Sequence, residues 1–320
     1  MGLLIPEVFI LLLTDSITML LLIYASPYAF QIASKWDMAS SANQQYKLEK
    51  RRYLLSTIVF YVFLFKIPLF LFYVYTNDKL ASVLTGAMCA AGSINATLYG
   101  SKLLYIKMLN IFLMSGWLAV YKGNNTFEDL PYTRIKYAFL LFIVLTVTAE
   151  TALSFLNFAN IDPTAVVSCC SSIYSTGGDD VSLLMSIKPF TAFYTFIGCS
   201  VLLITAILLK NAPLTAILSA AFFFTGVANL ILFTGTYVYE LPSHKCPYCI
   251  LQKEYMYVGY AFYISLFLAA ANGINTLIYK IVLKATPVRS FRISLIFVLI
   301  FMLISLFFPL RYYAINSVWL

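Results

Sequence analysis

The sequence predicts an all-α protein, a polytopic membrane helical bundle of about eight transmembrane helices that forms a single integral membrane domain over residues 1–320. The first observation is composition: 62% of the residues are hydrophobic and 11% are charged, where a soluble domain carries roughly 25% charged residues. The second is a mean hydropathy of +0.87. The third is that apolar stretches of about 20 residues, the length that spans a bilayer, recur along the whole chain.

Length and apolarity place the predicted spans at residues 5–29, 54–75, 103–120, 137–158, 189–209, 214–236, 256–279 and 293–310. The first stretch differs from a signal peptide, because no Lys or Arg precedes it and both Glu7 and Asp15 lie within it. We therefore interpret it as the first spanning helix. No soluble domain is visible between the spans, and the long loop at 159–188 contains the Gly-rich turn STGGDD.

The basic residues predict the orientation of the chain. Most of the 21 Lys and Arg residues fall at 34–53, 121–136, 280–292 and the turn at Lys210. By the positive-inside rule these connections face the cytoplasm, which places both termini outside. We therefore expect an inner (cytoplasmic) membrane protein whose alternate loops face the periplasm. The net charge of +8 belongs to this topology, so membrane lipid is the expected partner and nucleic acid is not.

The cysteines are unevenly distributed over this topology. All but one fall in the predicted outer loops: Cys89, Cys169, Cys170, Cys246 and Cys249. The outer face of such a membrane is the oxidising compartment, where disulfides form and persist. The exception, Cys199, lies within a predicted helix, and we expect it to be a small apolar packing residue. The outer cysteines are therefore the main functional signal in the sequence.

The motif HKCPYC at 244–249 is first interpreted as a redox pair. Pro247 is favourable at the first position of a helix, so helical geometry beginning there would place Cys246 at a helix N-terminus, which favours its thiolate. His244 and Lys245 add cationic groups beside it. On this interpretation Cys246 attacks and Cys249 resolves. Cys169 and Cys170 form a second redox couple, or each bonds elsewhere, for example Cys170 to Cys246 during turnover, and Cys89 is auxiliary.

A Cys-x-x-Cys pair at the outer end of a spanning helix, with a second cysteine pair in another outer loop, resembles the membrane thiol oxidoreductases of the disulfide-bond protein B and vitamin K epoxide reductase families. The resemblance implies that Cys246 and Cys249 lie beside a bound quinone. It also implies that Cys169 and Cys170 shuttle electrons from an outer-face partner, such as a periplasmic thioredoxin-like protein. The function it implies is quinone-linked thiol–disulfide exchange. The string CPYC is also similar to a glutaredoxin active site.

Two other interpretations of the same residues stay open. His244, Cys246 and Cys249 offer His-x-Cys-x-x-Cys, and the remaining outer cysteines add soft ligands that suit Cu or Zn. The protein would then be a soft-metal-binding membrane subunit or transporter. Alternatively, the outer cysteines form only structural disulfides that tie the loops together. The sequence does not decide among the three.

Charged residues within the predicted spans form a separate signal, because such groups are costly in a bilayer and usually functional. Asp15, Lys66 and Glu150 are the intramembrane polar candidates. We expect Lys66 to pair with Asp15 or Glu150, next to Pro68, which interrupts the backbone hydrogen bonds. The group would form a proton path or the polar wall of a quinone pocket, or else an ion pair that only fixes helix register. Lys66 snorkelling to water is a further alternative, and Lys107 is expected to reach water.

Overall fold

The computed structural model describes residues 5–37, 43–127, 130–167, 185–284 and 287–320. These ranges contain helices and connecting segments and no strand, which confirms the predicted all-α class. Within them, eight helical segments are long and apolar enough to cross a membrane. Their bounds are Pro6–Lys35, Gln45–Ala81, Gly100–Asn124, Thr133–Ala159, Pro189–Leu208, Ala212–Tyr239, Val258–Ile281 and Val288–Asn316. Each predicted span overlaps one of them. The side on which the termini lie stays a prediction.

The chain packs as two compact units, each with four of the spanning segments. Unit 1 comprises Met1–Val83, Ser93–Ala165 and Ile281–Lys284. Unit 2 comprises Leu84–Gly92, Val166–Lys280 and Ala285–Leu320. The short segment Leu84–Gly92 therefore packs with unit 2, although the chain on both sides of it belongs to unit 1. The predicted single domain stays a prediction.

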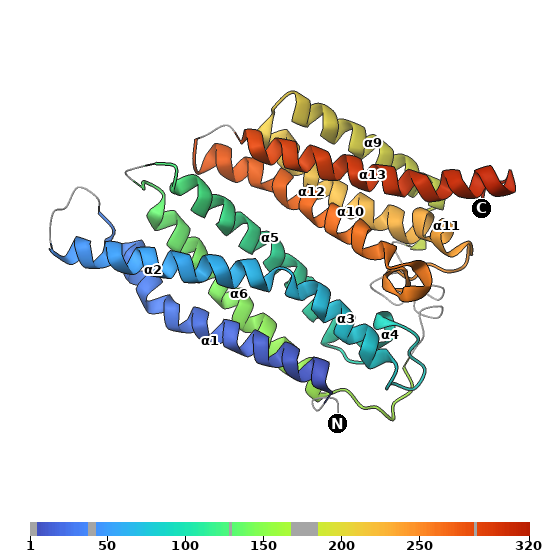
Figure 1. Ribbon diagram of the computed structural model, residues 1–320, viewed down its shortest axis with the longest axis horizontal. Helices are drawn as coiled ribbons and strands as arrows, with labels where there is room; N and C mark the ends of the chain where they lie inside the picture. The colour runs from blue at the N-terminus through green and yellow to red at the C-terminus, as the bar shows by residue number, and fades with distance from the viewer. Residues whose placement is uncertain (1–4, 38–42, 128–129, 168–184, 285–286) are drawn as a thin grey trace. The chain divides into compact units, whose positions relative to one another are not determined.

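Unit 1 is built from five long helices (Figure 1): α1 (Pro6–Lys35), α2 (Asn43–Lys66), α3 (Leu69–Ala81), α5 (Gly100–Asn124) and α6 (Thr133–Ala159). The single turn α4 (Ala90–Ile94) precedes α5. The second span consists of α2 and α3, because Pro68 has no N–H to continue the helical hydrogen-bond ladder. Helix α6 packs against both α1 and α5. The predicted interruption beside Lys66 is thereby confirmed.

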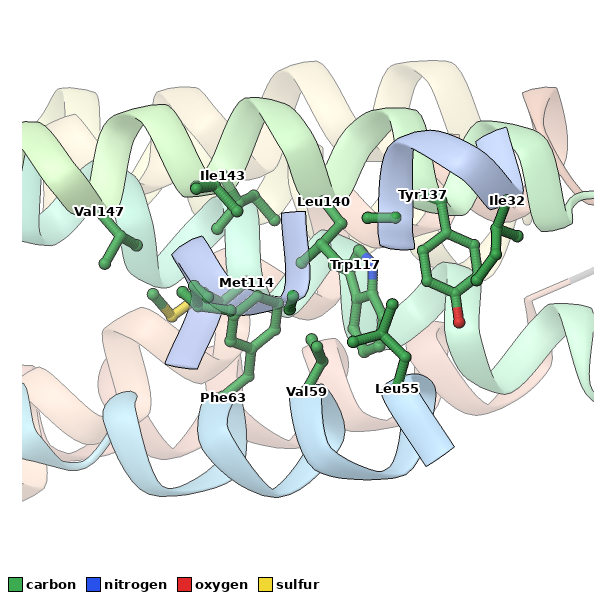
Figure 2. Packing of buried hydrophobic residues seen from close by; sticks show 14 of the residues in the cluster. Ile32, Leu55, Val59, Phe63, Met114, Trp117, Tyr137, Leu140, Ile143 and Val147 are labelled. Atoms are coloured by element: carbon green, nitrogen blue, oxygen red, sulfur yellow. The ribbon is translucent and has the colours of Figure 1, made fainter. Parts of the chain in front are cut away.

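The hydrophobic core of unit 1 is centred on Trp117 of α5, which Figure 2 shows between side chains of α2 and α6. The ring of Phe63 meets the Trp117 ring edge-on, with centroids 5.2 Å apart. The Trp117 indole donates a hydrogen bond from Nε1 to the carbonyl of Lys136 at 3.1 Å, so its polar edge is satisfied inside the core. Truncating a buried aromatic such as Phe63 to Ala is expected to cost about 3–5 kcal/mol.

Unit 2 contains four long helices: α9 (Pro189–Leu208), α10 (Ala212–Asn229), α12 (Val258–Ile281) and α13 (Val288–Asn316). Phe301 of α13 is central to its core, with ring centroids 5.5 to 5.7 Å from those of Phe196, Phe222 and Phe262. Gly226 permits this packing, because a Cβ there would lie 2.8 Å from the Leu266 side chain. Aromatic rings from four helices thus meet at the centre of this core.

Helix α10 continues through a π-helical turn, η2 (Leu230–Thr234), into the short α11 (Gly235–Tyr239). The buried Asn229 spans this turn by donating to the Thr234 hydroxyl at 2.9 Å. A π turn inserts an extra residue and so rotates the face that the following residues present. Beyond α11, two short 3₁₀ turns, η3 (Cys249–Leu251) and η4 (Lys253–Tyr255), lead into α12. This connection carries HKCPYC.

Candidate functional site

Three cysteines of unit 2 form a cluster. The Sγ atoms of Cys89, Cys246 and Cys249 all lie within 4.8 Å of one another. The sulfur atoms of Cys89 and Cys246 are 3.4 Å apart. All three residues are buried, and they are present as thiols. We call them the cysteine cluster. It joins the predicted Cys-x-x-Cys pair to a cysteine more than 150 positions earlier in the sequence.

Cys89 is positioned by a short loop that packs against unit 2. The backbone N–H of Val167 donates to the carbonyl of Thr85 at 3.0 Å, and the Gln252 side chain donates to the carbonyl of Met88 at 3.4 Å. Gly86 has φ +89°, a conformation that L side chains rarely adopt, and a Cβ there would lie 2.6 Å from the Val167 carbonyl oxygen. A glycine is therefore required where this loop turns toward the cluster.

Two tyrosines hold the loop of the Cys-x-x-Cys pair. The Tyr239 hydroxyl, at the end of α11, donates to the carbonyl of Cys246 and accepts the backbone N–H of Ile250 at 3.1 Å. The Tyr263 hydroxyl of α12 donates to the carbonyl of Pro247 at 2.6 Å. The backbone groups of a non-helical loop are thereby satisfied by side chains of the flanking helices. The sulfur atoms are consequently held by rigid elements on both sides.

The expected helix N-terminus at Cys246 is wrong. Pro247 lies in a turn, and the residues after it form only the 3₁₀ turns η3 and η4, so α12 begins at Val258. Met256 and Tyr257 both have positive φ, which prevents the helix from extending back to the cysteines. Gly259 at the start of α12 instead lies against the cysteine loop, since a Cβ there would be 2.8 Å from the Ile250 side chain. The N-terminus of α12 is therefore not at Cys246 and does not favour its thiolate as expected.

His244 lies beside the cluster but is not one of its members. Its ring packs edge-on against Tyr239, with centroids 4.2 Å apart. Its Nε2 atom is buried and has no hydrogen-bond partner among the described residues. Burial lowers the pKa of His244 below its ordinary value, and a charge interaction with Cys89 opposes that lowering. His244 is therefore a predominantly neutral imidazole close enough to Cys89 to interact with its charge.

The arrangement of the cluster suits two kinds of chemistry. Reacting atoms held about 3–3.5 Å apart are in near-attack geometry, and the Cys89–Cys246 sulfur pair meets that condition. Thiolates bound about 2.3 Å from one Zn ion in a tetrahedral site lie about 3.8 Å from one another, and the cluster is compact enough for this as well. The third interpretation, disulfides that only tie the loops together, stays an alternative, because the same two sulfur atoms are close neighbours.

Two further predicted cysteines, Cys169 and Cys170, lie outside the described residues. Cys199 lies in α9, half-buried, and its Sγ approaches the carbonyl of Leu218 on α10 at 3.8 Å. That contact between two helices agrees with the packing role expected for it.

Unit 1 contains a second polar centre, which we call the ionic quartet: Asp15 on α1, Lys66 on α2, Lys107 on α5 and Glu150 on α6. Lys66 Nζ pairs with Asp15 Oδ1 and, at 3.0 Å, with Glu150 Oε1. Lys107 Nζ lies 3.0 Å from Asp15 Oδ2 and 2.7 Å from Glu150 Oε1. Each cation therefore contacts both anions, and the quartet is electrically neutral. The expected pairing of Lys66 with Asp15 or Glu150 is confirmed for both partners.

Additional side chains complete the hydrogen bonding of the carboxylates. Asn110 donates from Nδ2 to Glu150 Oε2 at 2.6 Å, and the Ser154 hydroxyl donates to Asp15 Oδ2 at 3.2 Å. The Lys107 ammonium also lies 5.0 Å from the centroid of the Tyr73 ring. A cavity of about 10 Å³ borders Lys66, Lys107 and Asn110, which is close to the smallest space that holds a water. The quartet is thus satisfied almost entirely by protein groups.

The expectation that Lys107 reaches water is wrong, because its side chain is only 5% exposed. It lies about two turns inside α5 from the helix start at Gly100. Its side chain points inward, where it pairs with the carboxylates of Asp15 and Glu150. Asn110 and Ser154 were not predicted. Their spacing is the signal that could have found them: Asn110 follows Lys107 by three positions and Ser154 follows Glu150 by four, so each pair shares a helix face.

Comparisons of the chain with protein families, with curated proteins and with solved structures found no match. The eight apolar helices indicate a multi-pass α-helical membrane protein, and its described residues include a buried cysteine cluster and a separate buried ionic quartet.

Proposed function

We propose that the protein is a membrane thiol–disulfide oxidoreductase in which Cys89 exchanges with the Cys246–Cys249 pair. The observation that carries this proposal is the 3.4 Å separation of the Cys89 and Cys246 sulfur atoms, with Cys249 within 4.8 Å of both. Disulfide exchange needs three sulfur atoms, namely an attacking, a central and a leaving one. The cysteine cluster supplies these roles from two separate loops.

The exchange step conserves electrons. With Cys246 and Cys249 joined as a disulfide, the Cys89 thiolate attacks Cys246 Sγ. The Cys89–Cys246 bond forms, the Cys246–Cys249 bond breaks, and Cys249 leaves as a thiolate that takes up a proton. His244 is the proposed acceptor of the Cys89 proton, since its imidazole is neutral and its Nε2 carries no other hydrogen bond in the described structure.

The complete turnover links an outer-face protein dithiol to a membrane quinone. The partner's two thiols become a disulfide and release two electrons and two protons, and the quinone takes up both to become a quinol. Cys169 and Cys170 are the proposed contact pair for a thioredoxin-like partner. The cysteine loops are proposed to face the periplasm, because the connections rich in Lys and Arg are expected on the cytoplasmic side of the membrane.

A second candidate function is binding of a soft metal, Cu or Zn, by the same three sulfurs. The observation that favours it is that all three ligand atoms lie within 4.8 Å of one another. Three buried thiolates form a trigonal site for Cu(I), and a fourth ligand would complete a Zn site. His244, whose charge interacts with Cys89, is the candidate for that fourth position, although it lies outside the group in the present geometry.

The test is acid-quenched thiol trapping with mass spectrometry on the purified protein, before and after a reductant and then a soluble quinone. We expect the Cys246–Cys249 peptide to carry two alkyl groups in the sample quenched after reduction. In the sample quenched after quinone addition, it should carry none. Cys246→Ser should abolish the cycle. Cys199→Ser is the matched control, since Cys199 lies in α9 away from the cluster, and it should cycle as the unsubstituted protein does.

Two outcomes would contradict the proposal. If stoichiometric metal co-purifies and the cluster cysteines become alkylatable only after chelation, the metal function replaces it. If Cys246 and Cys249 keep one oxidation state throughout, the pair does not exchange electrons and the reaction does not occur.

A further inference from the structure

Unit 1 has a cavity beside the ionic quartet, and unit 2 has a cavity of its own near the ends of α11 and α13. Its volume is about 100 Å³, an order of magnitude larger than the cavity beside the ionic quartet. Its walls come from α11 and the residue after it, from η4 and the residue after it, and from the last turns of α13. We call it the interface cavity. Its lining residues are Tyr237, Val238, Glu240, Glu254, Tyr255, Met256, Phe308, Arg311 and Tyr312.

The charged residues of this cavity are Glu240, Glu254 and Arg311. All three residues are exposed, and none of them forms an ion pair with another described residue. Two carboxylates and one guanidinium thus border the same space without neutralising one another. A ligand that carries one cationic and one anionic group would satisfy both signs of charge at once.

Aromatic rings form much of the remaining wall. Tyr237 and Tyr312 meet edge-on with centroids 5.6 Å apart, and Tyr255 packs against Tyr239 with centroids 4.8 Å apart. Ring faces within about 6 Å attract ammonium groups, particularly where carboxylates stand beside them. Burial raises the pKa of Tyr255, so its hydroxyl stays a neutral hydrogen-bond donor and acceptor.

The backbone is strained at this cavity. Glu240 has φ 54° and Met256 has φ 53°, and neither is a glycine. Left-handed conformations of such residues cost free energy, on the order of 1 kcal/mol or more each, and they cluster where a structure holds side chains for binding. Both strained residues line the cavity, and one of them supplies a carboxylate.

We propose that the interface cavity binds the headgroup of a zwitterionic phospholipid. Arg311 contacts the phosphate, because a guanidinium matches phosphate oxygens bidentately. Glu240, Glu254 and the tyrosine rings contact the ammonium. The size of the cavity agrees with a headgroup, because whole drug-sized ligands occupy pockets of about 300 Å³ or more. This site is independent of the proposed thiol–disulfide function.

The position of the cavity favours a lipid over a soluble zwitterion. Helix α13 is apolar enough to span a membrane, and Arg311 and Tyr312 lie in its last two turns. Tyr and Arg at the ends of spanning helices sit at the level of lipid headgroups. Val238 and Phe308 add apolar groups to the lining, which the first carbons of an acyl chain would contact. A soluble zwitterion has no acyl chain to contact these apolar residues.

The test is native mass spectrometry of the delipidated protein after addition of phosphatidylethanolamine, of phosphatidylglycerol, or of free phosphoethanolamine. We expect at least tenfold preference for phosphatidylethanolamine over phosphatidylglycerol. Arg311→Met should reduce binding of both lipids, whereas the double variant Glu240→Gln with Glu254→Gln should remove only the preference. Arg289→Met, an exposed arginine at the beginning of the same helix, is the matched control and should bind as the unsubstituted protein does.

Three results would overturn the proposal. Equal binding of both lipids, unaffected by the glutamate variants, would show that the carboxylates do not recognise an ammonium. Lipid binding that is unchanged in Arg311→Met would place the lipid elsewhere. Binding of free phosphoethanolamine as tight as that of the lipid would assign the cavity to a soluble zwitterion.

Discussion

The ionic quartet and the cysteine cluster are both buried polar centres, but they differ in how their groups are bonded. In the quartet each ammonium contacts both carboxylates, and Asn110 and Ser154 occupy further carboxylate oxygens. In the cluster, two cysteine sulfur atoms lie 3.4 Å apart, beside an imidazole whose Nε2 is buried and has no hydrogen bond in the described structure. The difference supports the proposals that the quartet holds helices together and that the cluster exchanges its sulfur bonds.

For Asp15, Lys66 and Glu150 the sequence left open a proton path, the wall of a quinone pocket, or an ion pair that fixes helix register. A proton path or quinone wall requires groups that can change partners beside enough space for a guest. The cavity at the quartet is about 10 Å³, room for little more than a water, and the charges neutralise one another. The geometry therefore favours the register-fixing ion pair, extended to four residues on four helices.

The largest expected effect comes from breaking the quartet. Lys107→Met leaves Asp15 Oδ2 and Glu150 Oε1 each without one cation, and removing one partner of a buried ion pair costs about 3–5 kcal/mol of unfolding free energy. Thermal unfolding followed by tryptophan fluorescence measures this loss. The protein that remains folded should still cycle Cys246 and Cys249, because the quartet and the cluster belong to different units.

The matched control for this prediction is Lys102→Met, an exposed lysine on the same helix, which should unfold within about 0.5 kcal/mol of the unsubstituted protein. The double variant Asp15→Leu with Lys66→Met removes one charge of each sign and keeps the Lys107–Glu150 pair. It should lose less stability than the sum of its two single variants. Equal losses from Lys102→Met and Lys107→Met would contradict a structural role for the quartet.

A smaller effect is expected at the cysteine cluster when the pH falls. The pKa of His244 in the folded protein is lowered from its ordinary value of about 6.5, so the unfolded chain binds the proton more readily. The stability linked to His244 is therefore present above about pH 6.5 and is lost as the pH falls through the folded pKa. Thermal unfolding at pH 7 and pH 5 should show a larger decrease for the unsubstituted protein than for His244→Gln. An equal decrease in both would show that His244 is not held neutral.

The helices were predictable because a bilayer span has a required length and composition. Each apolar stretch became one spanning segment, and Pro68 interrupted the second one beside Lys66 as its missing N–H requires. Only some of the buried charged residues of the quartet could be recognised from the sequence. Lys66 was recognised by its depth in an apolar stretch, whereas Lys107, near the beginning of α5, was misjudged because its two acidic partners come from other helices.

The site was less predictable than the fold. The spacing of Cys246 and Cys249 identified that pair, but nothing in the sequence signals that Leu84–Gly92 packs with unit 2 and brings Cys89 to it. Long-range contacts of this kind depend on tertiary packing. The expected helix at Pro247 failed for a local reason, because the left-handed conformations of Met256 and Tyr257 end any backward extension of α12.

The most direct test of the central claim is a trapped intermediate. Cys249→Ser removes the leaving sulfur, so oxidation of this variant in its native membrane should join Cys89 to Cys246. The account predicts a peptide linked through these two residues in a non-reducing digest, which disappears in the double variant Cys89→Ser with Cys249→Ser. If Cys246 instead stays alkylatable under the same oxidation, while Cys89 also stays reduced, the two sulfurs do not exchange and the account is contradicted.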